Sequence, residues 1–345
     1  MDISFAQYLA LFSASMLAVG LLTPLMRLIA VRLNVVDSPD QSHKTHRTPI
    51  PYLGGVAIIL GVLGVTSLSL IGYSMSQANT ILALSLLLPA IALGLIGLVD
   101  DIRNLSPWPR FVAQSVVGLL TAILLIITDT VGSPTGSVLV DALITIIWIV
   151  GITNSINFFD NLDGGASGTV AITSIALLIL ALQGEQYLIA AMAAVLAGAT
   201  LGFLVWNKPP ARIYMGDAGA LFLGLLIASL VVRLDTNPIN NFATFSIPIL
   251  LLAVPIMDTS VAVLSRLQRG ISPFQGGKDH LSHRLIRSGL SKRLSVISLW
   301  IMSAYFGSIA IVISNAPFKF EGVISSIGIF SWLIVFALFI RMKSE

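Results

Sequence analysis

Asp100 and Asp101 stand side by side directly after a long apolar run, residues 80–99. Adjacent carboxylates repel each other and resist burial, so packing alone gives little reason for such a pair beside an apolar segment. Two carboxylates can bind a hard cation such as Mg²⁺, or one can act as a general base whose pKa the other adjusts. A solvated loop whose aspartates cap helices would also contain them, so the interpretation depends on the other polar segments.

A second polar stretch contains Asn154, Asn157, Asp160 and Asp163, which recur every third residue. In a helical turn, such positions project from neighbouring parts of one face. Asparagine offers donors and acceptors for a base or a sugar, and aspartate offers charge for a metal or a hydroxyl group. The stretch has no Lys or Arg, so a bound cation would be its natural partner. The alternative is a polar connection between two helices.

Asp217 lies in a Gly216-Asp-Ala-Gly219 segment that leads directly into another apolar run. Such an entry places a carboxylate and exposed backbone N–H groups together at the positive end of a helix, although Asp217 could equally be a plain N-cap. Asp258 is an acid near the end of a later apolar run and so a further site candidate. It could instead cap or break its helix after Pro255.

Two basic clusters suit phosphate. The first contains Lys44 and His46, and the second contains His280, His283 and Arg284. Cationic side chains pair with phosphate oxygens. Contact with a pyrophosphate fits the second cluster better than zinc, because two histidines without a clear third ligand make a weak zinc site. The alternatives are an ordinary positive flank of a membrane helix for the first cluster and a basic amphipathic surface helix for the second.

Membrane helices must position these residues. Hydrophobic residues make up 56% of the chain and charged residues 10%, and the mean hydropathy is +0.95, whereas soluble domains have about 25% charged residues. Eleven apolar runs, continuous rather than alternating, approach the length needed to span a membrane as helices. The runs are residues 6–28, 54–71, 80–99, 110–127, 138–153, 167–182, 186–206, 218–234, 243–264, 294–314 and 321–340. We therefore predict a single all-α polytopic membrane domain, residues 1–345, with about eleven transmembrane helices.

The basic residues set the orientation. All of the 19 Lys and Arg residues except Arg233 and Lys319 fall in the odd-numbered loops or at the C-terminus, which the positive-inside rule places in the cytoplasm. The N-terminus is then outside and the C-terminus is cytoplasmic. We expect the site to be formed by the cytoplasmic loops 34–53, 100–109, 154–167, 207–217 and 265–293.

An ion-coupled transporter is the alternative from another class. It would place its acids near mid-span and would show a symmetric pair of broken helices. Here the acids stand at span ends on one side, which favours an enzyme. Carboxylates repel anionic phosphates unless a divalent metal bridges them, so acids beside basic clusters indicate a phosphorylated, nucleotide-activated substrate. The membrane setting indicates a lipid co-substrate, and hence phosphoryl transfer to a lipid at the cytoplasmic interface.

At these motifs the chain resembles the polyprenyl-phosphate N-acetylhexosamine-1-phosphate transferases. This family includes the bacterial enzymes that start O-antigen, enterobacterial common antigen and teichoic acid synthesis, and phospho-MurNAc-pentapeptide translocase. The resemblance covers nearly the whole chain and rests on five segments in the family's order. They are His46…Pro51-x-Leu-Gly-Gly55, Asp100-Asp101, Asn157-x-x-Asp160-x-x-Asp163-Gly164, Pro210-Ala-Arg-Ile-x-Met-Gly-Asp217-x-Gly219 and Ser272-Pro-Phe…His280-x-x-His283-Arg284.

The resemblance implies that undecaprenyl phosphate, or a similar lipid, attacks the β-phosphate of a UDP-sugar to give a polyprenyl-diphospho-sugar and UMP, with Mg²⁺ or Mn²⁺ required. It implies that Asp217 binds the metal, and that Asp100 and Asp101 position the metal and the lipid phosphate, with one of them a candidate base. The residues implied to hold the nucleotide-sugar and its diphosphate are Asn157, Asp160, Asp163, His280, His283, Arg284, Lys44 and His46.

Three positions depart from the family's usual pattern. Asn161 and Ser282 stand where a glycine and a histidine are usual, and Ala220 stands where a serine is usual. These changes bear on the sugar more than on the reaction. We expect UDP-GlcNAc, with another UDP-HexNAc (a QuiNAc or FucNAc form) or UDP-MurNAc-pentapeptide as alternatives. The expected partners are the UDP-sugar and the polyprenyl phosphate within the inner (plasma) membrane, without nucleic acid, and a homodimer is left open.

Overall fold

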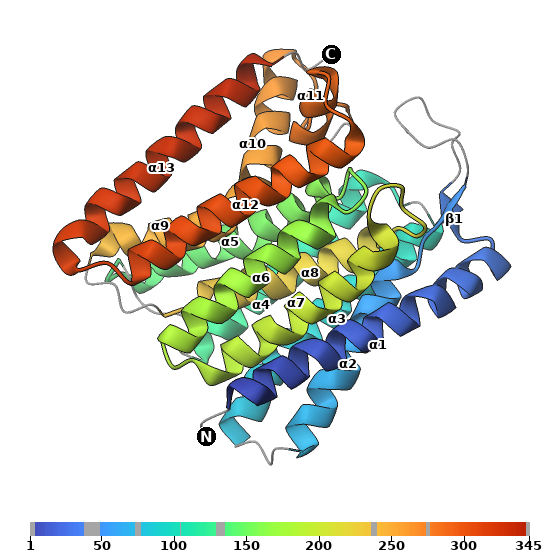
Figure 1. Cartoon of the computed structure of the whole chain (residues 1–345), viewed down its shortest axis with the longest axis horizontal. Helices are drawn as coiled ribbons and strands as arrows, with labels where there is room; N and C mark the ends of the chain where they lie inside the picture. The colour runs from blue at the N-terminus through green and yellow to red at the C-terminus, as the bar shows by residue number, and fades with distance from the viewer. Residues whose placement is uncertain are drawn as a thin grey trace.

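The computed structural model describes residues 4–37, 49–72, 77–103, 105–128, 135–235, 240–273 and 277–342. Within these ranges the chain is nearly all helix, which confirms the predicted fold class (Figure 1). The elements are α1 (Phe5–Arg32), β1 (Val36–Asp37), β2 (Ile50–Pro51), α2 (Gly54–Gly72), α3 (Gln77–Arg103), α4 (Pro107–Ile127), α5 (Val138–Phe159), α6 (Gly165–Gln183), α7 (Tyr187–Asn207), α8 (Gly216–Val232), α9 (Asn241–Leu251), α10 (Ala253–Gln268), α11 (Leu281–Arg287), α12 (Lys292–Ser314) and α13 (Phe318–Arg341). The two short strands pair antiparallel.

Nine helices in the described part of the chain are long and apolar enough to cross a membrane. α9 and α10 pass the same test only as a pair, bent by 77° at the break between them, and α8 is shorter, with 17 residues. Every predicted apolar run coincides with one of these helices, and the run 243–264 coincides with the bent pair. A multi-pass membrane protein is therefore confirmed, whereas eleven crossings and the orientation stay predictions.

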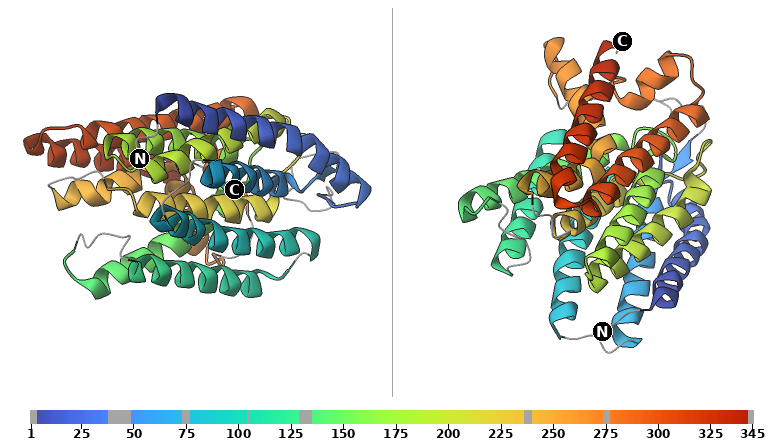
Figure 2. Two further views of the ribbon diagram at one scale, coloured as in Figure 1. Left: turned by 90° about the horizontal axis from the view of Figure 1, so that it is seen from below. Right: turned by 60° about the vertical axis from the view of Figure 1, so that its left-hand side comes forward.

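Helix α8 forms the centre of the bundle. It packs against α2, α3 and α5, and all of its residues except Asp217 and Val232 are buried. A helix that is apolar all round belongs in the interior, and the yellow α8 lies inside the bundle in Figure 2. By contrast, α4 and α13 expose large apolar side chains such as Leu120 and Phe330. Such exposed faces suit contact with lipid.

Glycine lets the start of α2 touch the start of α8. The N–H groups of Gly54 and Gly55 donate to the carbonyls of Tyr214 and Met215 at 3.0 and 2.9 Å. A Cβ atom added to Gly55 would lie 2.2 Å from the backbone nitrogen of Gly219, far inside contact distance. The Leu-Gly-Gly segment of the sequence motif therefore fixes where α8 begins.

The bend between α9 and α10 is held by side chains from two other helices. The hydroxyl of Thr173 donates to the Leu251 carbonyl, and the indole N–H of Trp332 donates to the Ala253 carbonyl, each at 3.0 Å. The first bond satisfies a carbonyl at the end of α9, where the helical ladder leaves carbonyls without partners, and the second ties the first residue of α10 to α13. The bend turns α10 toward α11 (Figure 1), and Asp258 on α10 accepts the N–H of Leu281, the first residue of α11.

Two helices continue past the predicted ends of their apolar runs. α3 extends to Arg103 and α5 to Phe159, so Asn154 and Asn157 lie on the last turns of α5 rather than in a loop. Hydropathy falls where these polar residues begin, but Asn and Asp are only mildly unfavourable in a helix. Within the predicted loop 265–293, the short helix α11 carries the histidine motif.

Candidate active site

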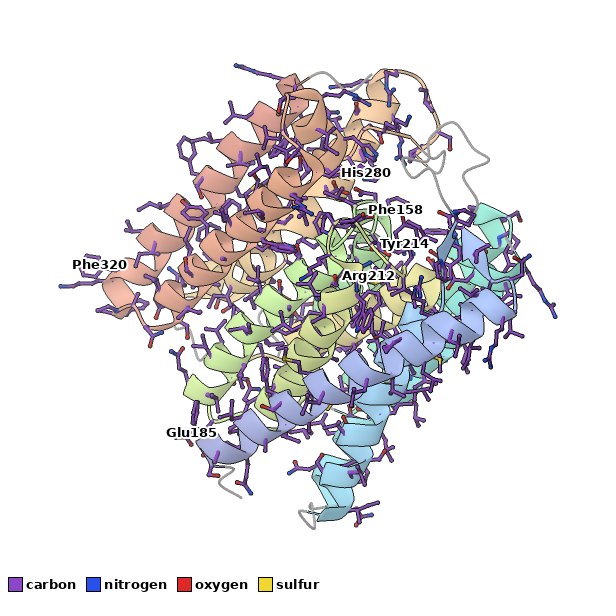
Figure 3. All side chains as sticks on the ribbon, turned by 45° about the vertical axis from the view of Figure 1, so that its right-hand side comes forward. Phe158, Glu185, Arg212, Tyr214, His280 and Phe320 are labelled. Carbon is purple, nitrogen blue, oxygen red and sulfur yellow. The ribbon has the colours of Figure 1, made fainter. Side chains whose placement is uncertain are left out.

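The polar segments meet at one end of the bundle, here called the polar end. Figure 3 shows Phe158, Tyr214 and His280 near this end, whereas Glu185 and Phe320 lie at the opposite side of the bundle. Contacts among the side chains show which of the candidate residues are brought together.

Asp101 caps the first turn of α8 from the neighbouring helix α3. Its two carboxylate oxygens accept the backbone N–H groups of Asp217 at 2.8 Å and of Ala218 at 3.1 Å. Gly216 precedes them with φ +67°, and a Cβ there would lie 2.4 Å from Asp101 Oδ2. A helix start leaves N–H groups without partners, so Asp101 has a clear structural task at this position.

Arg110 joins Asp100 to Asp217. One of its terminal nitrogens donates to Asp100 Oδ2 and to Asp217 Oδ2, both at 2.6 Å. The remaining carboxylate oxygens are also engaged, because Asp100 Oδ1 accepts the Leu105 N–H at 2.7 Å and Asp217 Oδ1 accepts Asn157 Nδ2 at 2.8 Å. Two carboxylates from different helices thus share one guanidinium.

The sequence assigned Arg110 no role in the site, because it was counted only among the basic residues that set the membrane orientation. The chain reverses after α3, and α4 begins beside it, so the first turn of α4 returns to the level of Asp100. The short connection with Ser106 and Pro107 was the available signal, because it brings the next basic residue back toward the acidic pair.

The loop after α5 adds two more carboxylates. Asp160 ends the helix, and burial raises its pKa to about 7, with the charges of Asp217 and Asp163 adding to the shift. Asp163 Oδ2 accepts the N–H of Ala211 at 2.9 Å. The pKa of Tyr214 is raised by burial and by the nearby Asp163 carboxylate. This part of the site therefore holds more negative charge than Arg110 alone can balance.

Asp258 organises the histidine segment. It is fully buried and accepts His280 Nδ1 at 2.7 Å and the N–H of Leu281 at 2.8 Å. His280 Nε2 lies 3.3 Å from Arg266 Nη2. This pattern fits the tautomer with its proton on Nδ1 and a lone pair on Nε2 that accepts from Arg266. Both nitrogens of His280 are therefore used within the protein. Asp258 lies inside α10 and accepts the first N–H of α11, so it neither caps nor breaks its own helix.

Arg284 is committed to internal bonds. It is 1% exposed and donates to the Asp279 carbonyl at 2.9 Å, to Ser265 Oγ at 2.9 Å and to the Phe339 carbonyl at 2.8 Å. Asp279 in turn accepts a bidentate pair of bonds from Arg266 at 2.8 Å. Arg284 thus ties α11 to α10 and to the end of α13.

His283 is the member of the histidine motif that remains available. Its Nδ1 lies 3.5 Å from Ser282 Oγ, its ring centroid lies 6.0 Å from that of His280, and among the described residues no hydrogen bond reaches Nε2. Burial lowers its pKa to about 4, with the neighbouring His280 as the second cause. A neutral ring can donate or accept at neutral pH. Lys44 and His46, the remaining predicted binding residues, lie outside the described residues.

Comparison with known proteins decides the family. A protein of Bacillus subtilis named "Probable undecaprenyl-phosphate N-acetylglucosaminyl 1-phosphate transferase" is 33% identical over 338 residues, which cover 95% of this chain and 87% of that protein. The family model described as glycosyl transferase family 4 matches residues 81–235. The chain belongs to glycosyl transferase family 4. This confirms the resemblance found in the sequence motifs.

Other relatives are similar over less of the chain. Decaprenyl-phosphate N-acetylglucosaminephosphotransferase of Mycobacterium tuberculosis is 32% identical over 321 residues, covering 84% of this chain and 79% of the relative. Phospho-N-acetylmuramoyl-pentapeptide-transferase of Bacillus licheniformis is 32% identical over 240 residues, covering 64% and 72%. The family match spans the acidic segments from α3 to α8 and ends before the histidine segment.

Proposed function

We propose that the protein transfers a HexNAc-1-phosphate, most simply GlcNAc-1-phosphate, from a UDP-sugar to a polyprenyl phosphate and releases UMP. A lipid phosphate oxygen attacks the β-phosphorus, the bond from that phosphorus to the oxygen bridging the two phosphates breaks, and UMP leaves with that oxygen. The names of the relatives support the reaction class. The relative from Bacillus subtilis, which is named for N-acetylglucosamine, is 33% identical over 95% of this chain, which supports UDP-GlcNAc.

The observation that carries the proposal is the position of Arg110 between two carboxylates, in the first turn of a helix whose other side is an apolar groove. The groove follows one face of α4 and is lined by Trp108, Phe111, Val112, Ser115, Val116 and Leu119. Arg110 lies in the first turn of the same helix, on the side away from this groove, and its head reaches Asp100 and Asp217. A polyprenyl phosphate has the matching form, with an anionic head and a long apolar chain. Guanidinium is well suited to phosphate oxygens.

The donor would lie on the other side of Asp217, toward the loop after α5 and α11. Asn157 bonds to Asp217 and Asp163 bonds to the N–H of Ala211, and we propose that the donor reaches His283 from this side. A neutral imidazole and carboxylates are suited to sugar hydroxyl and amide groups. The excess of basic residues in the odd-numbered loops supports a cytoplasmic site in the plasma membrane, where UDP-sugars are available.

The attacking group does not need a strong base. A phosphate monoester loses its second proton with a pKa of about 6, so most of the lipid phosphate carries a free oxygen at neutral pH. Asp101 is engaged by two backbone N–H groups, and Asp100 is engaged by Arg110 and Leu105. The work of Asp100 is then to orient Arg110 and the lipid phosphate, which is the positioning role expected from the sequence.

A divalent cation fits the chemistry of this donor set. No group of three acidic or histidine ligands is arranged for a metal within the described ranges, but Mg²⁺ is usually held by one or two carboxylates together with substrate phosphates and water. Asp217, with Asp100 beside it, offers oxygen ligands of that kind. The ion would neutralise charge on the diphosphate. Mg²⁺ or Mn²⁺ is therefore proposed as the cofactor.

An assay of the purified protein tests the proposal. UMP release and lipid-linked product are measured with undecaprenyl phosphate, Mg²⁺ and separate UDP-GlcNAc, UDP-GalNAc, UDP-QuiNAc and UDP-MurNAc-pentapeptide donors. We expect turnover with UDP-GlcNAc, its loss in EDTA and its return with Mg²⁺. The variant Asp217→Asn should lose at least about a thousandfold, as for other charge-stabilising groups in active sites, without rescue by added metal. Folded protein that forms no product with any donor would refute the proposal.

A further inference from the structure

Arg233 is a buried cation at the end of the bundle opposite the acidic cluster. It directly follows the last residue of α8 and is 4% exposed. Its backbone carbonyl accepts Gln186 Nε2 at 2.9 Å, and Gln186 directly follows Glu185, which Figure 3 shows on the side of the bundle away from the polar end. Asp217 stands in the first turn of the same helix, so the two charged residues lie about 24 Å apart along its axis.

Only one of the three guanidinium nitrogens of Arg233 has a partner within the described ranges. Nη2 donates to Ser85 Oγ on α3 at 3.1 Å, whereas Nε and Nη1 are buried and reach no hydrogen-bond acceptor there. No carboxylate in those ranges pairs with the cation either, although Asp235 is only two positions away in the sequence. A guanidinium stays charged in proteins, and a buried charge without an opposite charge is strongly disfavoured.

The position of Arg233 in the sequence is also unusual for a cation. Of the 19 Lys and Arg residues, only Arg233 and Lys319 fall in the even-numbered loops, which the predicted orientation places outside. Lys319 is exposed at the start of α13, so water can solvate it. The dipole of α8 favours a cation at this end, but among the described residues the Arg233 side chain donates to no carbonyl of that helix. An anion is the partner that the buried guanidinium requires.

The serine that holds Arg233 stands beside an apolar surface. Ile81 and Leu88 on α3 are 52% and 59% exposed. At about 100° per residue, Ser85 lies about 40° from Ile81 and about 60° from Leu88 around the helix axis. Ser85 therefore stands at the edge of an apolar stripe that suits contact with lipid chains. A lipid lying along this stripe would bring its headgroup next to Arg233.

We propose that Arg233 and Ser85 bind the phosphoryl group of an anionic phospholipid at this end of the bundle. Phosphoryl oxygens accept hydrogen bonds from a guanidinium and from a hydroxyl group, and their charge offsets the charge of the cation. The acyl chains of the lipid would lie along the stripe on α3. Inorganic phosphate offers the same oxygens without the chains, so the experiment separates the two sources. The site lies apart from the acidic cluster and does not depend on the proposed transfer reaction.

Titration of the full chain in detergent with phosphatidylglycerol tests the proposal. The thermal midpoint is followed against lipid concentration to give an apparent Kd, and phosphatidylcholine and inorganic phosphate form two further arms. The titrations are run at about 1 M NaCl, where the Debye length is about 3 Å, so that contacts with exposed basic residues are screened. Arg233→Met removes the buried cation. Lys319→Gln is the matched control, because it removes an exposed cation from the same predicted side.

Phosphatidylglycerol should raise the thermal midpoint of the parent and of Lys319→Gln with the same Kd. The Kd for Arg233→Met should be at least about tenfold higher, which is the scale of a hydrogen bond to a charged group. Phosphatidylcholine, which has no net charge, should also bind the parent at least about tenfold more weakly. If inorganic phosphate raises the midpoint of the parent as far as phosphatidylglycerol does, and not that of Arg233→Met, the anion site stands with free phosphate as its ligand.

Equal Kd values for the parent and Arg233→Met would overturn the proposal, and so would an equal loss in Lys319→Gln. If Arg233→Met does not fold, Arg233→Lys provides the second test, because it keeps the charge but not the planar set of donors. Its Kd for phosphatidylglycerol should rise several-fold, and an unchanged value would refute binding by Arg233. None of these measurements uses UMP release, so failure here leaves the proposed function untouched.

Discussion

Replacing Arg110 by alanine should expose a repulsion that the structure now balances. Asp100 Oδ2 and Asp217 Oδ2 each lie 2.6 Å from the same guanidinium nitrogen, so the two oxygens are separated by about 5 Å at most. At an effective dielectric constant of about 20, two like charges at that distance repel by about 3 kcal/mol. Arg110 keeps 27% of its side-chain surface exposed, so the repulsion that remains after solvent screening will be smaller.

The catalytic loss follows from the same geometry. Without Arg110, the carboxylates disfavour an incoming lipid phosphate, and about 3 kcal/mol corresponds to somewhat more than a hundredfold in kcat/KM. After screening, we expect Arg110→Ala to lose about 30- to 100-fold, mainly through a higher KM for undecaprenyl phosphate. Arg110→Lys keeps the charge but not the fork of donors, so it should lose less, about tenfold.

The assay varies undecaprenyl phosphate and UDP-GlcNAc separately at fixed Mg²⁺. Arg103→Ala is the control, because Arg103 is an exposed cation on the last turn of α3 and its loss changes net charge equally. Activity of Arg110→Ala within twofold of the parent would refute the reasoning. So would a loss expressed only in the KM for UDP-GlcNAc, since that would place the cation on the donor side.

Three further predictions address other parts of the site. His283 has a pKa of about 4 in the folded protein, against an ordinary value of 6.5. Its contribution to stability is therefore present above about pH 6.5 and is lost as the pH falls toward 4. The thermal midpoint in detergent should fall over that pH range, and it should fall less in the variant His283→Asn. Arg284→Met should lower the thermal midpoint, because the bonds to the end of α13 are lost, while the KM for UDP-GlcNAc of the folded protein changes less than twofold. An unchanged midpoint with a raised KM would instead show that Arg284 binds substrate. Val116→Gln in the α4 groove should raise the KM for undecaprenyl phosphate by several-fold, whereas Val323→Gln, at a similarly exposed position on α13, should not.

The arrangement of helices could largely be predicted from the sequence. Hydropathy located every long helix because a membrane span must satisfy its own backbone and present apolar side chains. It placed the central helix at 218–234, close to Gly216–Val232. The break between α9 and α10 was not predicted, because the side chains that support it come from Thr173 and Trp332, far away in the sequence.

The contacts within the site could be predicted only in part. The residue types of Asp100, Asp217 and Asn157 identified a common site, and the structure brings these three residues together. Arg110 was missed because its partners lie on two other helices. The bond between Asn161 and Ser282 was not predicted, because the two residues are 121 positions apart in the sequence.

The adjacent aspartates that first indicated a site have different environments. Neighbouring positions on a helix point in directions about 100° apart, and here that difference sends Asp101 to the backbone of α8 and Asp100 to the guanidinium of Arg110. The first contact fixes the start of the helix that carries Asp217. The second shares a cation with the side chain of Asp217. The pair of acids therefore positions Asp217 twice, once through its backbone and once through its carboxylate, which explains why two charges stand together where packing alone would tolerate neither.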